Sequence, residues 1–174
     1  DPEDGRLCAA RERILALGGI QAANSYVKIN LSLFGLYPRE HVPSVPPEIA
    51  IAGKFLYQMS SWTRAIVVAL SIVHAHNPSR PVPAGLSLAE LFLPGAPMGL
   101  GRTEKTFSWR NLFLTIDRGV KLWEMYGPAP IRRRAIREAE RWMVERFAHS
   151  DGLGAIYPPM MYAIMALDVL GYGE

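Results

Sequence analysis

The sequence predicts an all-α fold in which polar outer helices pair with apolar inner helices around an interior space. Apolar residues recur at three- and four-residue steps in several stretches, and no stretch shows the sustained apolar–polar alternation of a strand. The 14 prolines and 15 glycines gather between these stretches. With 49% hydrophobic and 20% charged residues, residues 1–174 are expected to form one packed domain.

The first expected helix pair covers residues 6–17 and 21–36. In the first helix the apolar residues share one side, and the charged residues 11–13 lie on the other. Gly18 and Gly19 end it, because glycine readily takes the left-handed conformation at a helix end. The second helix is less polar, as an inner helix should be.

An apolar helix is expected over residues 54–75, between two connectors. Residues 41–48 contain three prolines, which indicates an extended segment. Residues 78–105 form a connector that is unusually long for a compact domain. Its one short helical candidate is 87–92.

Three further helices are expected from residue 109 onward. Residues 109–126 carry apolar side chains at helical spacing and charged ones on another side. Residues 131–147 are strongly charged with a narrow apolar stripe, which is typical of an outer helix. Residues 159–170 are apolar on nearly every side, so the stretch 156–171 is expected to wall the interior.

Charge and composition restrict the class of partner. The net charge is +3, and nucleic-acid binding is not expected because no basic stripe is interleaved with stacking aromatics. We interpret the one dense basic run as a solvated outer face, with contact to anionic lipid headgroups as the alternative. This run is Arg132, Arg133, Arg134, Arg137 and Arg141. No apolar stretch reaches the roughly 20 residues of a membrane-spanning helix, and no metal site is expected.

Two inner segments align with one another when Ile20 is placed on Ile156. The aligned identities are Ile20 and Ile156, Tyr26 and Tyr162, Leu31 and Leu167, and Gly35 and Gly171. A charged helix and a glycine-containing turn precede each copy. The pattern predicts a repeated unit of outer helix, turn and inner helix, and such units must stack or close into a ring to bury their apolar members.

Several strings in the sequence resemble the middle region of squalene–hopene cyclases. They are the stretch 18–38, the Val-Pro-Ser-Val-Pro-Pro-Glu-Ile string at 42–49, and the Ser-Trp-Thr-Arg helix start at 61–64. Residues 151–159 resemble a worn copy of the family's glutamine–tryptophan repeat, with Phe147 in place of the glutamine and Leu153 in place of the tryptophan.

The resemblance implies a pair of α/α barrels around an apolar cavity. Residues 1–174 would then be one partial α/α barrel, mostly from the second barrel. Family members sit in one membrane leaflet and cyclise squalene without metal or cofactor. A proton from the middle aspartate of an Asp-x-Asp-Asp motif starts the reaction, and aromatic faces stabilise the cations. No such motif occurs here, and Asp117 and Asp168 stand alone. We therefore assign no catalytic residue and expect no cyclisation by this chain alone.

The resemblance also suggests residues that line the cavity or its entrance channel. Tyr26 and Phe34 match positions that narrow the channel, and Asn30 stands where the family usually has a cavity tryptophan. Four residues match the cavity-side end of an inner helix: Ile156, Tyr157, Pro158 and Tyr162. The alternative for each is ordinary packing between helices. Trp62 and Arg64 are expected to be structural, with Trp62 buried and Glu48 as the partner of Arg64.

The helix at 109–126 matches the region that dips into lipid in the family. Its wide stripe with Trp and Phe independently suits an interfacial helix, and packing on the domain is the alternative. The expected lipid contacts are Trp109, Leu112, Phe113, Ile116, Val120 and Trp123.

The expected function is a segment of a triterpene cyclase at the cytoplasmic face of the membrane, peripheral or monotopic. Its expected partners are squalene or a related polyprenoid, the membrane surface, and either the remainder of the cyclase or a second copy of the chain. The alternatives are a non-catalytic helical-repeat module that binds lipid or a partner protein, and a related class II cyclase with another polyprenoid substrate.

Overall fold

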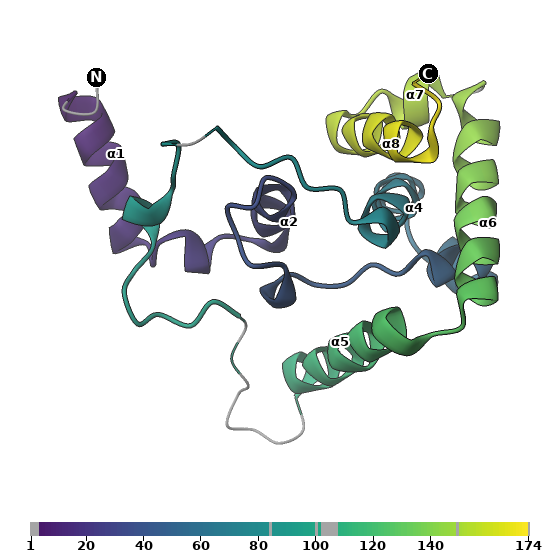
Figure 1. Cartoon of the computed structure of the whole chain (residues 1–174), viewed down its shortest axis with the longest axis horizontal. Coiled ribbons are helices and arrows are strands. Elements are labelled where there is room, and N and C mark those ends of the chain that lie inside the picture. The colour runs from purple at the N-terminus through teal and green to yellow at the C-terminus, as the bar shows by residue number, and fades with distance from the viewer. Residues whose placement is uncertain (1–3, 84, 100, 102–107, 149, 174) are drawn as a thin grey trace. The chain divides into compact units, whose positions relative to one another are not determined.

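The computed structural model of the chain describes residues 4–83, 85–99, 101, 108–148 and 150–173, and every regular element in these ranges is helical (Figure 1). This confirms the predicted all-α class. The α-helices are α1 (Gly5–Ala16), α2 (Ser25–Leu33), α3 (Lys54–Tyr57), α4 (Ser61–His76), α5 (Trp109–Tyr126), α6 (Ala129–Phe147), α7 (Asp151–Gly154) and α8 (Tyr157–Leu170). Single 3-10 turns are η1 (Ile20–Ala22), η2 (Arg39–His41), η3 (Pro47–Ile51) and η4 (Ala89–Leu91).

The chain divides into two compact units. Unit 1 comprises Asp1–Pro43 and Ser79–Thr115, and unit 2 comprises Ser44–Pro78 and Ile116–Glu174. Each unit is described by itself below. The expected single partial barrel over residues 1–174 stays a prediction.

Side chains of the first helices hold the long connector in unit 1. The Gln21 amide pairs with the backbone of Leu93 in both directions, with Nε2 donating to the carbonyl at 2.9 Å and Oε1 accepting from the N–H at 3.2 Å. Arg11 forms an ion pair with Glu90 at 3.1 Å. The connector is therefore ordered by contacts with distant residues. The helix expected at 87–92 is present only as η4. Residues 84, 100 and 102–105 of the expected connector 78–105 lie outside the described residues.

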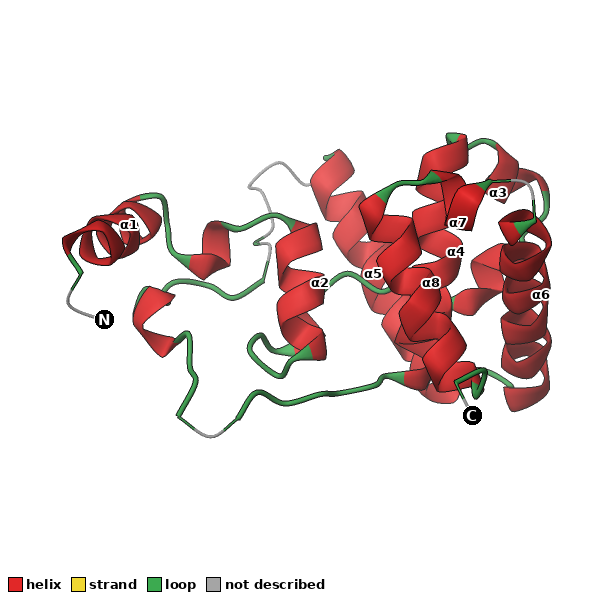
Figure 2. Cartoon of the chain, turned by 90° about the horizontal axis from the view of Figure 1, so that it is seen from above, coloured by secondary structure: helices red, strands yellow, loops and turns green. Residues whose placement is uncertain are grey.

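Unit 2 is built around α4, which packs against both α6 and α8 (Figure 2). The centre of α4 is fully buried, and small side chains on its neighbours let the helices approach closely. The buried residues of the three helices include Val68, Ala69, Ile72 and Val73 on α4, Ala135, Ala139 and Met143 on α6, and Tyr162, Ala163 and Ala166 on α8. Apolar packing thus defines this core.

Two expected helices are divided, at capping residues that the apolar pattern did not reveal. The range 21–36 begins as η1 and becomes α-helical only after Asn24, and the range 54–75 breaks before Ser60. Each capping side chain accepts a hydrogen bond from the backbone N–H three residues later. The distance is 3.0 Å for Asn24 Oδ1 and 3.4 Å for Ser60 Oγ. These caps satisfy N–H groups that an uninterrupted helix would have bonded internally.

The aligned helices α2 and α8 end with the same backbone geometry. Gly35 and Gly171 have positive φ values of 70° and 86°. The N–H after each glycine donates to the carbonyl five residues earlier, at 2.9 Å after Gly35 and 3.0 Å after Gly171. Matching caps are what two copies of one unit would have, and the repeat itself stays a prediction.

Alanine at either cap should destabilise the chain. A Cβ at Gly35 or Gly171 meets nothing within 4 Å, so the cost comes from the left-handed backbone alone. We expect each substitution to lower the free energy of unfolding by about 1 kcal/mol in urea titrations. Gly119→Ala, within α5, should instead raise it by about 0.5–1 kcal/mol. Neutral results at both caps would contradict this account.

Candidate functional site

The three predicted lining residues of unit 1 share one face of α2 and its C-terminal end. Tyr26, Asn30 and Phe34 follow one another at four-residue steps, and both aromatic side chains are exposed. Asn30 is half-buried and its Nδ2 donates to the Tyr26 carbonyl at 2.8 Å. The buried residues of α2 lie on the adjoining side of the helix and are Lys28, Ile29, Ser32 and Leu33. The helix thus presents two aromatic rings away from the packed side of its unit.

A buried polar group on the packed face fixes this rotation of α2. The Lys28 ammonium donates to the Gln21 carbonyl at 2.8 Å and lies 5.4 Å from the centre of the Tyr37 ring. Burial lowers the pKa of Lys28 and raises the pKa of Tyr37. The Tyr37 hydroxyl donates to the Met98 carbonyl. These contacts stay within unit 1 and leave the aromatic pair on the outer face.

The four predicted lining residues of unit 2 lie in different environments. Ile156 and Tyr157 at the start of α8 are exposed, the latter to 69%, and Pro158 is half-buried. Tyr162 is 0% exposed and belongs to the core of unit 2, in which α8 packs against α4. Helical geometry places Tyr162 on the opposite side of α8 from Tyr157. The structure therefore does not gather these four residues on one surface.

Two exposed residues of α8 were not singled out from the sequence. Met160 and Ile164 are exposed and lie on the same face as Tyr157, at i+3 and i+7. That spacing was the available signal. It was hidden because α8 is apolar on nearly every side, so no face stood out. The three side chains form an apolar strip on the outer face of α8.

Helix α5 is an amphipathic helix whose apolar side is exposed. None of its residues is buried, and Trp109 and Phe113 are 76% and 63% exposed. Leu112, Ile116 and Trp123 are exposed as well, and Val120 is half-buried. The structure thus places the six predicted lipid contacts along one outward stripe, where water would otherwise meet a large apolar surface.

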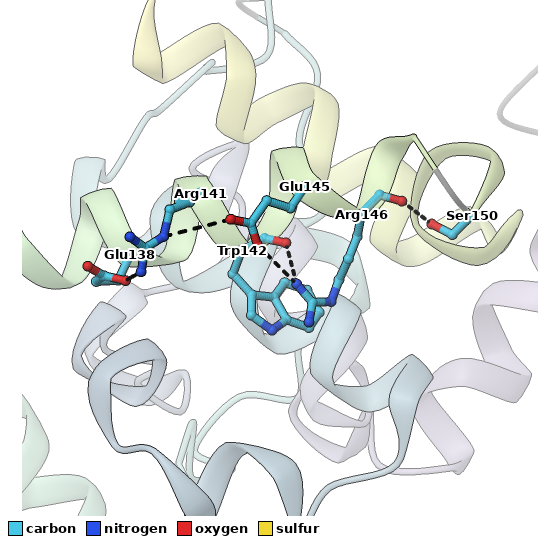
Figure 3. Close-up of polar contacts among 6 residues, drawn as sticks. All are labelled: Glu138, Arg141, Trp142, Glu145, Arg146 and Ser150. Carbon is cyan, nitrogen blue, oxygen red and sulfur yellow. Dashed lines mark hydrogen bonds and ion pairs between the residues drawn. The ribbon is translucent and has the colours of Figure 1, made fainter.

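The second half of α6 carries a self-contained charged cluster (Figure 3). Arg141 pairs with Glu138 and, at 3.9 Å, with Glu145. The Arg146 guanidinium stacks 3.9 Å from the centre of the Trp142 ring. Arg146 also lies 3.9 Å from Glu145, so Arg141 and Arg146 each have a glutamate partner on the same helix. These pairs favour a solvated outer face over a lipid-headgroup site at these two arginines.

One expected ion pair is wrong. Glu48 Oε1 accepts from Arg132 Nε at 3.4 Å, not from Arg64. Arg64 instead donates to the Met59 carbonyl at 2.9 Å, within the turn before α4. Trp62 is 55% exposed and not buried, because it lies on the outer side of the first turn of α4. Arg64 therefore caps the preceding turn and leaves Glu48 to another helix.

Neither a metal centre nor a membrane span is found within the described ranges. No three His, Cys, Asp or Glu side chains gather there in a way that could hold a metal ion. None of the helices that the structure describes has the length and apolar character needed to cross a bilayer.

Comparison with known proteins defines the class. The family model of the squalene-hopene cyclase N-terminal domain matches residues 1–174. The chain is 34% identical to the squalene–hopene cyclase of Zymomonas mobilis, over 99% of the chain and 27% of that relative. It is 37% identical to the Alicyclobacillus acidocaldarius squalene–hopene cyclase, over 90% of the chain and 25% of the relative. A dammaradiene synthase from Dryopteris crassirhizoma is 32% identical, over 98% of the chain and 26% of the relative.

The fold and these matches define a helical domain of a triterpene cyclase. The chain belongs to the squalene–hopene cyclase family, and the portion that it matches is the N-terminal domain. It spans about a quarter of the length of these curated relatives. The placement in the second barrel stays a prediction.

Proposed function

We propose that this chain is the part of a squalene–hopene cyclase-type enzyme that supplies membrane contact and part of the apolar wall for a polyprenoid substrate. The names of two relatives specify squalene as substrate and hopene as product. The proton donor of such a cyclisation is expected outside this chain. In this proposal the chain helps the polyprenoid substrate to enter from the membrane and forms part of the cavity around it. The process is hopanoid biosynthesis at the cytoplasmic face of the membrane.

The observation that carries the proposal is the outward apolar stripe of α5. A helix packed on a water-soluble domain turns its apolar side inward, whereas Trp109, Phe113 and Ile116 are exposed. Tryptophan and phenylalanine on an amphipathic helix are the side chains that enter the boundary between headgroups and acyl chains. A substrate as apolar as squalene dissolves in the bilayer, so a cyclase that takes it from there needs such a contact.

The exposed apolar residues of the inner helices fit the wall of a cyclisation cavity. Within unit 1, Tyr26 and Phe34 present aromatic rings. Within unit 2, Tyr157, Met160 and Ile164 present a separate apolar strip. A wall of this kind excludes water from a carbocation, and an aromatic face attracts the cation. The wall does not itself supply a proton, which agrees with the isolated positions of the aspartates.

Membrane contact is tested by flotation of the full 174-residue chain with phosphatidylcholine vesicles. Trp109→Ser combined with Phe113→Ser should lower the partition coefficient at least about tenfold, because two large apolar side chains no longer enter the lipid. Leu7→Ser combined with Leu17→Ser removes two exposed apolar residues, one in α1 and one at its C-cap, and should leave binding unchanged. The proposed contact would be refuted if both double variants lost vesicle binding equally, or if the α5 double variant lost none.

The division of labour is tested by incubating the chain with squalene and analysing the products by gas chromatography. We expect no pentacyclic product from the chain alone. Hopene formation would mean that the chain holds its own acid and would contradict the assignment. A full-length relative, incubated under the same conditions, serves as the positive control.

A further inference from the structure

The C-terminal half of α5 is attached to unit 2 by polar contacts. The Ser44 backbone N–H donates to Asp117 Oδ1 at 2.9 Å, and the Ser44 hydroxyl donates to Glu124 Oε2. Arg132, in the first turn of α6, donates from Nη1 to the Glu124 carbonyl at 2.8 Å. We call Ser44, Asp117, Glu124 and Arg132 the orienting clamp.

The orienting clamp is itself braced on both sides. Arg132 also donates from Nη2 to the Trp123 carbonyl at 3.4 Å and from Nε to Glu48 at 3.4 Å. Lys121 forms an ion pair with Asp117 at 2.7 Å, one helical turn away. Asp117, Arg132 and Glu48 are all mostly shielded from water. Contacts of this kind have a fixed direction, unlike apolar packing.

Hydrophobic packing does not fix the rotation of α5 about its axis, because none of its residues is buried. Asp117 and Glu124 lie on one strip of the helix, roughly a quarter turn from the stripe of Trp109. A rotation of that size would bring the apolar stripe against the protein and break both contacts with Ser44. The polar contacts therefore select the rotation in which the stripe faces outward.

We infer that the orienting clamp positions the membrane-contact helix, so that residues which never touch lipid control how strongly α5 enters it. The inference rests on the proposed membrane contact. The clamp residues are positioning residues that act through α5. They explain why Asp117 and Glu124 face the rest of unit 2.

The test uses the full chain and phosphatidylcholine vesicles with brominated acyl chains, which quench tryptophan that enters the lipid. Quenching of Trp109 is obtained by subtracting the signal of Trp109→Phe in each background. Asp117→Ala and Arg132→Ala should each lower partitioning about threefold or more, which is the effect of losing oriented hydrogen bonds, and should lower Trp109 quenching in the bound state. A residue with a merely structural role would not change the depth of Trp109 in the bound protein.

Matched variants separate orientation from charge and folding. Asp117→Asn keeps an oxygen that accepts from the Ser44 N–H, so its binding should stay close to that of the parent chain. Arg118→Ala removes an exposed arginine from the same helix and should have no effect in zwitterionic lipid. Where an alanine variant loses helical circular dichroism, Ser44→Ala reports on the clamp instead, because it changes neither helix.

The outcomes for the clamp and for the membrane contact are distinct. Parent-like partitioning and quenching in Asp117→Ala, Arg132→Ala and Ser44→Ala, together with lost binding in the Trp109 and Phe113 double variant, would overturn the clamp alone. Unchanged binding in that double variant would overturn the membrane contact, and the inference with it. The clamp is supported if Trp109 quenching falls in the alanine variants while Asp117→Asn keeps the partitioning and quenching of the parent chain.

Discussion

Tyr162→Ala should lower the free energy of unfolding by about 3–5 kcal/mol, the effect of deleting a large aromatic side chain from a packed core. Tyr162 is 0% exposed and lies among the residues that join α8 to α4. Tyr157→Ala removes the same side chain from the same helix where it is 69% exposed, and should change stability by less than about 0.5 kcal/mol.

Urea titrations followed by circular dichroism measure both variants. Tyr162→Phe keeps the ring volume and should cost at most about 1.5 kcal/mol. A cost below about 1 kcal/mol for Tyr162→Ala would mean that this side chain borders a space able to adjust, as a cavity wall would. The experiment therefore decides between the lining and packing interpretations for this residue.

The tyrosine pair of the predicted repeat shows how far sequence reasoning reaches. Tyr26 and Tyr162 occupy aligned positions, yet Tyr26 is exposed and Tyr162 is buried. Alignment identified the shared helix end, where Gly35 and Gly171 have the same geometry. It could not identify the buried face of α8, because a helix that is apolar all round carries no periodic signal.

Helix bounds were predictable where the apolar periodicity and the helix-ending glycine and proline residues indicated the same boundary. The bounds of α5 match the predicted 109–126, since its spacing is strong and Gly127-Pro128 follows. The start of α2 was missed because an Asn24 cap overrides apolar residues that could have extended the helix. Local chemistry decided the boundary there, and the apolar pattern alone did not contain it.

Partner choice among charged residues was the least predictable feature. Glu48 pairs with Arg132 on α6, 84 positions away, although Arg64 is much closer in sequence. Ser44 reaches Asp117 across 73 positions. Such pairs exist only once the fold has brought the segments together, and nothing in the residue types favours one arginine over another. The stripe of α5, in contrast, was predictable because it depends on one helix only.

The junction between α5 and α6 should tolerate no side chain at Gly127. A Cβ there would lie 2.5 Å from the Trp123 carbonyl oxygen, a backbone atom that cannot move aside without shifting the end of α5. Gly127 N–H donates to that oxygen at 2.7 Å, and Arg132 of the orienting clamp bonds to it as well. We expect Gly127→Ala to lower the free energy of unfolding by about 1–3 kcal/mol.

The same variant should weaken vesicle binding, because a displaced Trp123 carbonyl loosens the hold of Arg132 on α5. Gly119→Ala lies eight positions earlier, within α5. A Cβ there meets nothing within 4 Å, so this variant serves as the matched control for both measurements. Parent-like stability in Gly127→Ala would show that the junction relaxes freely. If Gly127→Ala loses the expected stability but binds vesicles like the parent chain, the contact of Ser44 with Asp117 sets the orientation of α5. The bond from Arg132 to the Trp123 carbonyl would then not be needed for it.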